Sequence, residues 1–161
     1  MVERSQWVEI TDEDPTHSQR YIERFRTMAE AGRDLAGEAR LIDAMAPRSA
    51  RILDAGCGPG RVGSTLAELG HEVVGVDVDP VLIAEAQREH PGATWLVGDL
   101  AELDLPAAGV AADYDVIVCA GNVMTFLAPS TRSLVVSRLG AHLADGGRLV
   151  VGFGAERGYP F

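Results

Sequence analysis

The chain has 161 residues, enough for one domain with a sizeable core, since a domain of about 150 residues buries about 68–70% of its unfolded surface. A hydrophobic fraction of 47% and a mean hydropathy of +0.05 are typical of a folded soluble protein. The net charge of −10 disfavours nucleic acid as a partner, because Lys and Arg contacts to phosphates supply much of that affinity.

Neither a membrane segment nor a metal site is predicted. The sequence contains no signal-peptide core and no run of about 18 apolar residues, so we expect a cytoplasmic protein without a membrane partner. Cys57 and Cys119 lie far apart and form neither a metal-ligand spacing nor a disulfide framework, which fits a reducing compartment.

The first 46 residues are expected to be helical after a flexible arm. Residues 1–15 are polar and acidic and form the predicted arm. Thr16 and Gln19 have capping-box spacing, which predicts a helix from Thr16. Gly32 and Gly37 each weaken a helix by up to about 1 kcal/mol relative to alanine, so we expect a break there.

A strand, a glycine turn and a helix follow in direct succession. Residues 51–55 are apolar and β-branched, residues 56–60 (Gly-Cys-Gly-Pro-Gly) are the glycine turn, and residues 61–69 have a helical pattern. Glycines allow positive φ and let a ligand approach N–H groups at the positive end of the helix. A second strand, 72–76, ends in Asp77, whose carboxylate beside the turn would suit a ribose with two free hydroxyls.

The glycine pattern alone admits a dinucleotide. Gly58, Gly60 and Gly63 satisfy G-x-G-x-x-G, and Asp77 follows at about the 20-residue spacing of a nicotinamide-binding unit. Against this interpretation, Asp54 lies inside the first strand, where a buried acid would repel a pyrophosphate but suit a cationic ligand. A third strand, 93–97, leads to Asp99, which adds another acid at the same sheet edge.

The remaining elements continue the alternation of strands and helices. Asp79 is the expected N-cap of a helix that starts at Pro80, which explains Asp79 structurally. The apolar run 114–120 is typical of a central strand covered on both faces. A helix capped by Ser130 or Thr131 is expected to end at Gly146-Gly147, before a fifth strand at 148–153. Five such alternations predict a parallel sheet with right-handed crossovers.

Three motifs in register resemble the class I S-adenosylmethionine-dependent methyltransferases. They are Leu-Asp-Ala-Gly-Cys-Gly-Pro-Gly at 53–60, Val-Gly-Val-Asp-Val-Asp-Pro at 74–80 and Val-Gly-Asp-Leu at 97–100. The resemblance covers roughly residues 50 to 155. It implies an α/β fold of Rossmann-like, doubly wound type, an α/β/α sandwich whose mostly parallel sheet has the order 3-2-1-4-5. Residues 1–46 would be an arm and helical lid, and 47–161 the S-adenosylmethionine-binding part of one compact domain.

The resemblance also implies S-adenosyl-L-methionine as cofactor and S-adenosyl-L-homocysteine as product. The glycine turn would lie against methionine and ribose, Asp77 would bind the ribose hydroxyls, and Asp99 would accept from the adenine amino group. The expected cofactor-binding residues are Asp54, Gly56, Cys57, Gly58, Gly60, Asp77, Val78, Gly98, Asp99, Leu100, Ala120 and Gly121.

The acceptor pocket is expected near Tyr21, Asn122, Met124 and Phe126. Core packing is an alternative for Met124 and Phe126, and a turn position for Asn122. The chain lacks the Pro-Cys and Asn/Asp-Pro-Pro-aromatic signatures of nucleic-acid methyltransferases, so a small molecule methylated on O, N or C is the remaining class of acceptor. No catalytic residue is predicted, and His17 is only a candidate base.

Two other functions stay open at this point, a nicotinamide-dependent oxidoreductase and a non-catalytic S-adenosylmethionine-binding module. Family members usually continue with a helix and two more strands after the fifth strand, whereas this chain stops at Phe161. We therefore expect either an incomplete chain or a homodimer that covers the apolar edge of that strand.

Overall fold

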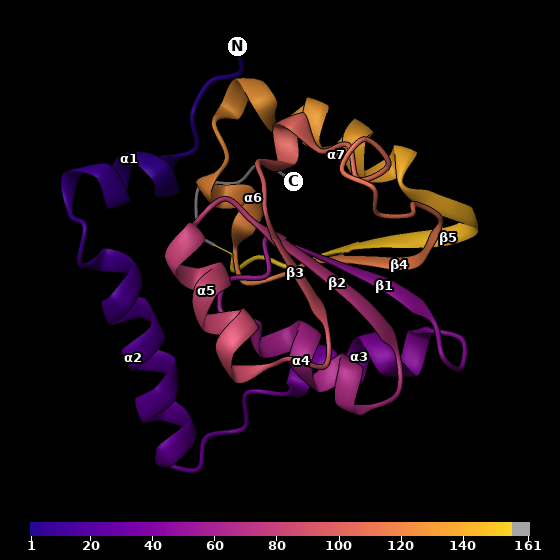
Figure 1. Cartoon of the computed structure of the whole chain (residues 1–161), viewed down its shortest axis with the longest axis horizontal. Coiled ribbons are helices and arrows are strands. Elements are labelled where there is room, and N and C mark those ends of the chain that lie inside the picture. Colours follow the sequence, from indigo (N-terminus) through magenta and orange to yellow (C-terminus); the bar gives the residue numbers. More distant parts are fainter. Residues whose placement is uncertain (156–161) are drawn as a thin grey trace.

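The computed structural model describes residues 1–155. Its sheet has five parallel strands in the order β3-β2-β1-β4-β5, which confirms the predicted topology (Figure 1). The strands are β1 (Arg51–Ala55), β2 (Glu72–Asp77), β3 (Thr94–Val97), β4 (Tyr114–Cys119) and β5 (Leu143–Val151). Each of the first three strands lies within one residue of its predicted bounds.

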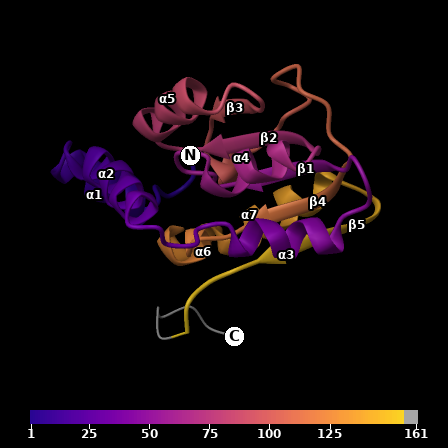
Figure 2. The same ribbon diagram turned by 90° about the horizontal axis from the view of Figure 1, so that it is seen from below.

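Helices cover both faces of the sheet, as expected of a doubly wound fold. Helices α3 and α4 lie on one face and α7 on the other, while α1 and α2 stand beside the sheet at the end to which the strands point (Figures 1 and 2). The helices are α1 (Gln6–Glu13), α2 (His17–Glu30), α3 (Gly37–Met45), α4 (Arg61–Glu68), α5 (Pro80–Glu89), α6 (Val123–Phe126) and α7 (Arg132–Ala141), with short 3-10 turns η1 (Leu100–Glu102) and η2 (Pro129–Thr131).

Alternate residues of the central strands enter two separate cores. Leu53 and Ile117 pack in the cluster that includes residues of η1 and α7. Ile52 and Val116 point the other way, into the cluster with α3 and α4. Successive side chains of a strand face opposite sides, and a parallel sheet covered on both faces needs apolar residues on both, which explains the unbroken apolar runs in the sequence.

The flexible arm predicted for residues 1–15 is wrong, because α1 occupies most of it. Ser5 caps this helix, its hydroxyl accepting from the Val8 amide at 3.3 Å. The capping box predicted at Thr16 is also absent, since the Thr16 hydroxyl donates to Asp14 at 2.7 Å. The predicted break is confirmed, as α2 ends at Glu30 and α3 begins at Gly37.

The boundary between α7 and β5 lies earlier than predicted. Helix α7 ends at Ala141 and β5 begins at Leu143, with an irregular register against β4 before Arg148. His142 explains the early stop: its Nε2 accepts from the Leu105 amide at 3.1 Å, so Nδ1 carries the proton that is donated to the Arg138 carbonyl at 2.7 Å. The helix end is therefore closed by a buried side chain that sequence periodicity does not show.

Within residues 1–155, every helix is too short or too polar to cross a membrane. In the same part of the chain β5 pairs with β4 alone, so it forms one edge of the sheet. The expected incomplete C-terminus concerns residues outside those that the structure describes.

Candidate active site

A cleft lies at the carboxyl ends of the strands, between the strand exits and the layer formed by α1 and α2. This edge of an open α/β sheet is where ligands bind. The lining residues are Ser5, Trp7, Tyr21, Phe25, Asp54, Gly56, Cys57, Gly58, Pro59, Arg61, Val62, Asp77, Val78, Leu82, Gly98, Asp99, Leu100, Ala120, Gly121, Val123, Phe126 and Leu127.

The glycine turn folds back onto the end of β2. The amides of Gly56 and Cys57 both donate to the Val76 carbonyl, at 2.8 and 3.0 Å. Gly56 has a φ of +76°, and a Cβ there would lie 2.4 Å from a methyl of Val123. Only glycine combines that backbone conformation with so close an approach, so the turn fixes the floor of the cleft at a position that no larger side chain can occupy.

Asp77 ends β2 with its carboxylate at the glycine turn, as the sequence predicts. One oxygen accepts from the Gly58 amide at 2.8 Å and the other from the Asp79 amide at 2.9 Å. Burial raises the pKa of Asp77 to about 6, although both amides favour the ionised form. Asp77 is thus an ionised carboxylate at neutral pH, and its lone pairs beyond those two bonds are available to hydroxyl donors.

Asp54 lies inside β1 and is 2% exposed. Its carboxylate accepts from the Gly63 amide in the first turn of α4 at 2.9 Å. Burial raises the pKa of Asp54 to about 7, and the Gly63 amide offsets only part of that rise. A cation brought into the cleft would complete the stabilisation of this carboxylate. The capping of α4 and the binding of a cation are compatible roles for it.

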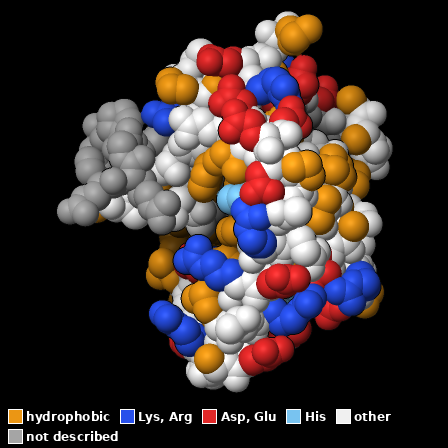
Figure 3. Space-filling view, turned by 90° about the vertical axis from the view of Figure 1, so that its left-hand side faces the viewer, with side chains coloured by type: hydrophobic (Ala, Val, Ile, Leu, Met, Phe, Trp, Pro, Cys, Tyr) orange, Lys and Arg blue, Asp and Glu red, His pale blue; other side chains and the backbone are white. Residues whose placement is uncertain are grey.

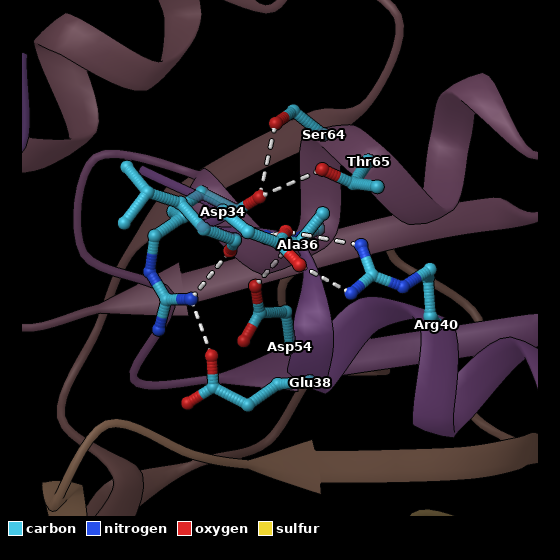
Figure 4. A network of polar contacts seen from close by, with 10 residues as sticks. Asp34, Ala36, Glu38, Arg40, Asp54, Ser64 and Thr65 are labelled. Atoms are coloured by element: carbon cyan, nitrogen blue, oxygen red, sulfur yellow. Dashed lines mark hydrogen bonds and ion pairs between the residues drawn. The ribbon is translucent and has the colours of Figure 1, made fainter. Parts of the chain in front are cut away.

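Arg61, the first residue of α4, is the one Lys or Arg among the described residues that line the cleft, and our sequence analysis did not identify it. Its guanidinium donates to the Leu35 carbonyl at 2.8 Å, pairs with Glu38 and lies 5.5 Å from the centre of the Phe25 ring. Figure 4 shows the surrounding network: Ser64 and Thr65 lie above Asp34 and Ala36, Arg40 lies to the right, and Asp54 and Glu38 lie below. The position of Arg61 directly after the glycine turn was the feature of the sequence that could have identified it as a cleft residue.

The exit of β3 supplies a third carboxylate. Asp99 lines the cleft and accepts from the Ala101 amide at 2.8 Å, which caps η1. The preceding Gly98 donates its amide to the Asp77 carbonyl at 2.9 Å, so the exits of β2 and β3 are held together. Asp54, Asp77 and Asp99 therefore lie at the carboxyl ends of three adjacent strands, around one cleft.

An aromatic wall closes the side of the cleft that faces α1 and α2. Trp7 packs edge-on against Tyr21 and Phe126, with ring centres 5.3 and 5.5 Å apart. Figure 3 shows the outer side of this layer, where acidic side chains gather above and acidic and arginine side chains are interspersed below. The charged side faces solvent and the aromatic side faces the cleft. Sequence analysis missed Trp7 because the arm around it was expected to be flexible.

The structure brings nearly all the predicted cofactor residues to the cleft. Gly60 is the exception: it caps α4 with a φ of +92° and does not line the cleft. Among the predicted acceptor residues, Tyr21 and Phe126 line it. Met124 is instead 1% exposed in the core, and Asn122 is a turn residue with a φ of 67° whose side-chain oxygen accepts from the Gly154 amide at 2.6 Å.

Comparison with known proteins identifies the family. The family described as "Methyltransferase domain" matches residues 52–147. A solved TehB-like SAM-dependent methyltransferase from Corynebacterium glutamicum is 51% identical with a TM-score of 0.86, and the match covers 92% of this chain and 78% of that one. A solved SAM-bound amino pentose methyltransferase from Micromonospora echinaspora is 29% identical with a TM-score of 0.69, covering 81% of this chain and 54% of that one.

Among curated proteins, an uncharacterised methyltransferase of Mycobacterium bovis is 35% identical over 114 residues, which is 69% of this chain and 54% of the relative. The chain spans about half the length of this and two other mycobacterial relatives that it matches equally well. The family match covers more than half of the chain and contains β2, β3 and β4, all but the first residue of β1, and the glycine turn. The chain therefore belongs to the class I S-adenosylmethionine-dependent methyltransferase family.

Proposed function

We propose that this protein transfers a methyl group from S-adenosylmethionine to a small-molecule acceptor. The observation that carries the proposal is the placement of three carboxylates, Asp54, Asp77 and Asp99, at the carboxyl ends of adjacent strands around one cleft whose floor is the glycine turn. A sulfonium cofactor with an amino group and a ribose offers a positive charge and several donors, which are what carboxylates bind. Family membership supports the same ligand.

The adenosine half would lie over the exits of β2 and β3. Asp77 would accept hydrogen bonds from the ribose hydroxyls and Asp99 one from the adenine amino group. Leu100, which lines the cleft beside Asp99, offers apolar surface for the base. Val78 and Leu82 line the same side, so the base would be held between apolar side chains.

The amino-acid half would lie over the exits of β1 and β4. Asp54 would orient the ammonium group, and Ala120 and Gly121 would line the same end. Arg61 supplies the cation that the carboxylate of methionine requires, because a carboxylate among three aspartates would otherwise be repelled. The two charged groups of the amino acid would thus each face an opposite charge.

The chain's own residues would position the reactants and exclude water. The cofactor supplies an activated methyl, and in transfer a bond forms from the acceptor atom to the methyl carbon while the carbon–sulfur bond breaks and its electron pair stays on sulfur. The aromatic wall of Trp7, Tyr21 and Phe126 would hold the acceptor in line and keep the reaction centre dry.

A methyl-transfer assay tests this function. Purified protein is incubated with S-adenosylmethionine that carries a tritiated methyl group and with pools of small hydroxyl, amine and carbon acids. Label should appear in one acceptor pool and unlabelled S-adenosylhomocysteine should form in equal amount. Cofactor binding without transfer to any pool would favour the non-catalytic binding module instead.

Arg61→Met is expected to weaken S-adenosylhomocysteine binding about 10-fold to 100-fold, because the ligand carboxylate would lose a charge-assisted hydrogen bond of about 1.5–3 kcal/mol. Binding of adenosine, which has no carboxylate, should change less than threefold. Glu38→Gln is the matched control, since it breaks the Arg61–Glu38 pair and keeps the cation. Calorimetric affinities that fall equally for both ligands would assign Arg61 a structural role only.

Binding is expected to weaken by about tenfold or more as the pH falls from 7.5 to 5.5, because Asp54 and Asp77 have pKa values of about 7 and 6 and the ligand needs both ionised. The unliganded protein should show the opposite trend. The folded state holds extra protons between the usual value of 3.8 and about 7, so the free energy of unfolding falls as the pH rises through that window.

Asp54→Asn is the control for the pH dependence. Asparagine can still accept from the Gly63 amide, but it does not titrate, so the slope of affinity against pH should become shallower. Calorimetry and chemical denaturation at several pH values supply both readouts. An unchanged slope in the variant would show that Asp54 is not the titrating group.

We also propose that residues 1–46 act as a helical lid and that residues 47–161 bind the cofactor.

The acidic net charge and the cysteines without disulfide partners, Cys57 and Cys119, support a cytoplasmic protein that binds no nucleic acid. A homodimer through the edge of β5 is proposed because β5 pairs with β4 alone among the described strands, and an unpaired edge favours pairing with a second copy. Sedimentation of the whole chain would measure its mass.

A further inference from the structure

The two carboxylate oxygens of Asp79 accept hydrogen bonds from different parts of the chain. One carboxylate oxygen caps α5, accepting from the amides of Val81 and Leu82 at 2.8 and 3.4 Å. The other oxygen accepts from the Trp7 indole N–H at 2.8 Å and from the Ser18 hydroxyl at 2.5 Å. Asp79 is 5% exposed, so these are buried contacts of a charged acceptor, which are the strong kind of hydrogen bond. Helix capping explains only half of what this side chain does.

The two donors come from both helices of the outer layer. Trp7 belongs to α1 and Ser18 to α2, and a single carboxylate oxygen at the start of α5 holds both. The same Trp7 ring forms the centre of the aromatic wall of the cleft. The position of that wall over the cleft is therefore set by the Asp79 carboxylate. We call Trp7, Ser18 and Asp79 the latch.

The latch is also joined to the residue that would hold the ribose. The Asp79 amide donates to Asp77 at 2.9 Å, and only Val78, which itself lines the cleft, separates the two. A ligand that orders Asp77 thereby orders the backbone that carries Asp79. The outer helices and the ribose site thus share one short segment of rigid backbone.

We propose that Asp79 is a positioning residue that holds α1 and α2 closed over the bound cofactor and thereby sets the rate at which the cofactor leaves. This inference rests on the proposed function, because it concerns the same cleft. Movement of α1 and α2 away from the cleft breaks two buried hydrogen bonds to the Asp79 carboxylate. Without the latch, α1 and α2 would leave the cleft more often, and a bound ligand would dissociate faster.

A second polar contact between α2 and α5 provides a natural control. Arg26 pairs with Glu85 at 2.7 Å outside the residues that line the cleft, and Glu85 also pairs with Arg88 at 2.5 Å. The Arg26 side chain is half-exposed, so solvent screens its pair with Glu85. Glu85→Gln therefore loosens the same helix pair without touching the latch, and it should leave ligand dissociation within about twofold of the wild-type rate.

Two variants open the latch without removing the helix cap or the aromatic wall. Asp79→Asn keeps a side chain that caps helices as well as aspartate, but its amide group presents a donor to the indole N–H. Trp7→Phe removes the indole N–H and keeps an aromatic ring against Tyr21 and Phe126. Trp7→Phe should raise the dissociation rate of S-adenosylhomocysteine about tenfold, as expected from the loss of one charge-assisted hydrogen bond, and Asp79→Asn at least as much, because it weakens the bonds from both Trp7 and Ser18.

The test is stopped-flow displacement of S-adenosylhomocysteine from the whole chain, with limited proteolysis between α1 and α2 as a second readout of opening. Each latch variant should dissociate at least about tenfold faster and be cleaved faster, and the double variant should be no faster than Asp79→Asn. Wild-type rates in both latch variants, or equal acceleration by Glu85→Gln, would overturn the latch. Failure of the wild-type protein to bind the ligand would instead overturn the proposed function.

Discussion

Asp77→Ala is expected to weaken S-adenosylhomocysteine binding by about 100-fold or more. Two ribose hydroxyls would lose a charged acceptor, and each such bond contributes about 1.5–3 kcal/mol. The Gly58 and Asp79 amides would lose the same acceptor, so the glycine turn and the start of α5 would also be less well ordered. Isothermal titration of the variant measures the combined loss.

Asp77→Asn separates the role of Asp77 in ribose binding from its role in holding the backbone amides of Gly58 and Asp79. Its side-chain oxygen can still accept from one of the two amides, while its amide group meets the ribose hydroxyls as a donor without the negative charge. We expect at least a tenfold loss of affinity in this variant, with a thermal midpoint above that of Asp77→Ala, because one of the two backbone amides keeps its acceptor. Equal affinity in Asp77→Asn and wild type would remove the ribose role from Asp77.

Gly75→Ala is expected to lower the free energy of unfolding by about 3 kcal/mol, the upper part of the usual range for overpacking a core. A Cβ at Gly75 would lie 2.3 and 2.4 Å from ring atoms of Trp95 and 2.9 Å from the Cys57 sulfur. The Trp95 ring cannot easily move away, because its indole N–H donates to the His90 carbonyl at 2.7 Å and the ring also lies against Gly63.

Gly92→Ala is the matched control for that substitution. A Cβ at Gly92 would meet nothing within 4 Å, so the same chemical change should alter stability by less than about 0.5 kcal/mol. In a Trp95→Leu background, Gly75→Ala should lower the free energy of unfolding by less than it does in the wild type, because the smaller leucine side chain makes room for the Cβ. Urea denaturation of the four variants measures these differences, and a Gly75→Ala protein as stable as Gly92→Ala would contradict the packing described for β2.

The sheet and its acidic edge could be predicted because their signals are local. Asp54, the glycine turn and Asp77 lie within a short stretch, and each motif predicts both a secondary structure and the kind of group that it can bind. Parallel strands then bring their carboxyl ends to one edge, so three motifs in sequence become one cleft in space. The alternation of strands and helices with the right-handed crossover rule predicted a parallel sheet, whereas the strand order 3-2-1-4-5 came from the family resemblance.

The aromatic wall and the latch could not be predicted because they depend on distant partners. Trp7 and Asp79 are 72 residues apart, and the sequence around either residue does not indicate a contact with the other. Asp79 had a sufficient local explanation as a helix cap, which concealed its second oxygen. His142 was missed for the same reason, since its role depends on a loop amide at Leu105 that periodicity does not register.

The measurement that tests the account most directly is isothermal titration of the whole chain with S-adenosylhomocysteine, with NAD as a parallel titrant. The account predicts micromolar or tighter binding of S-adenosylhomocysteine and no binding of NAD at the same concentrations, because three carboxylates surround the cleft. Binding of NAD alone would contradict it and would make the glycine turn a dinucleotide loop.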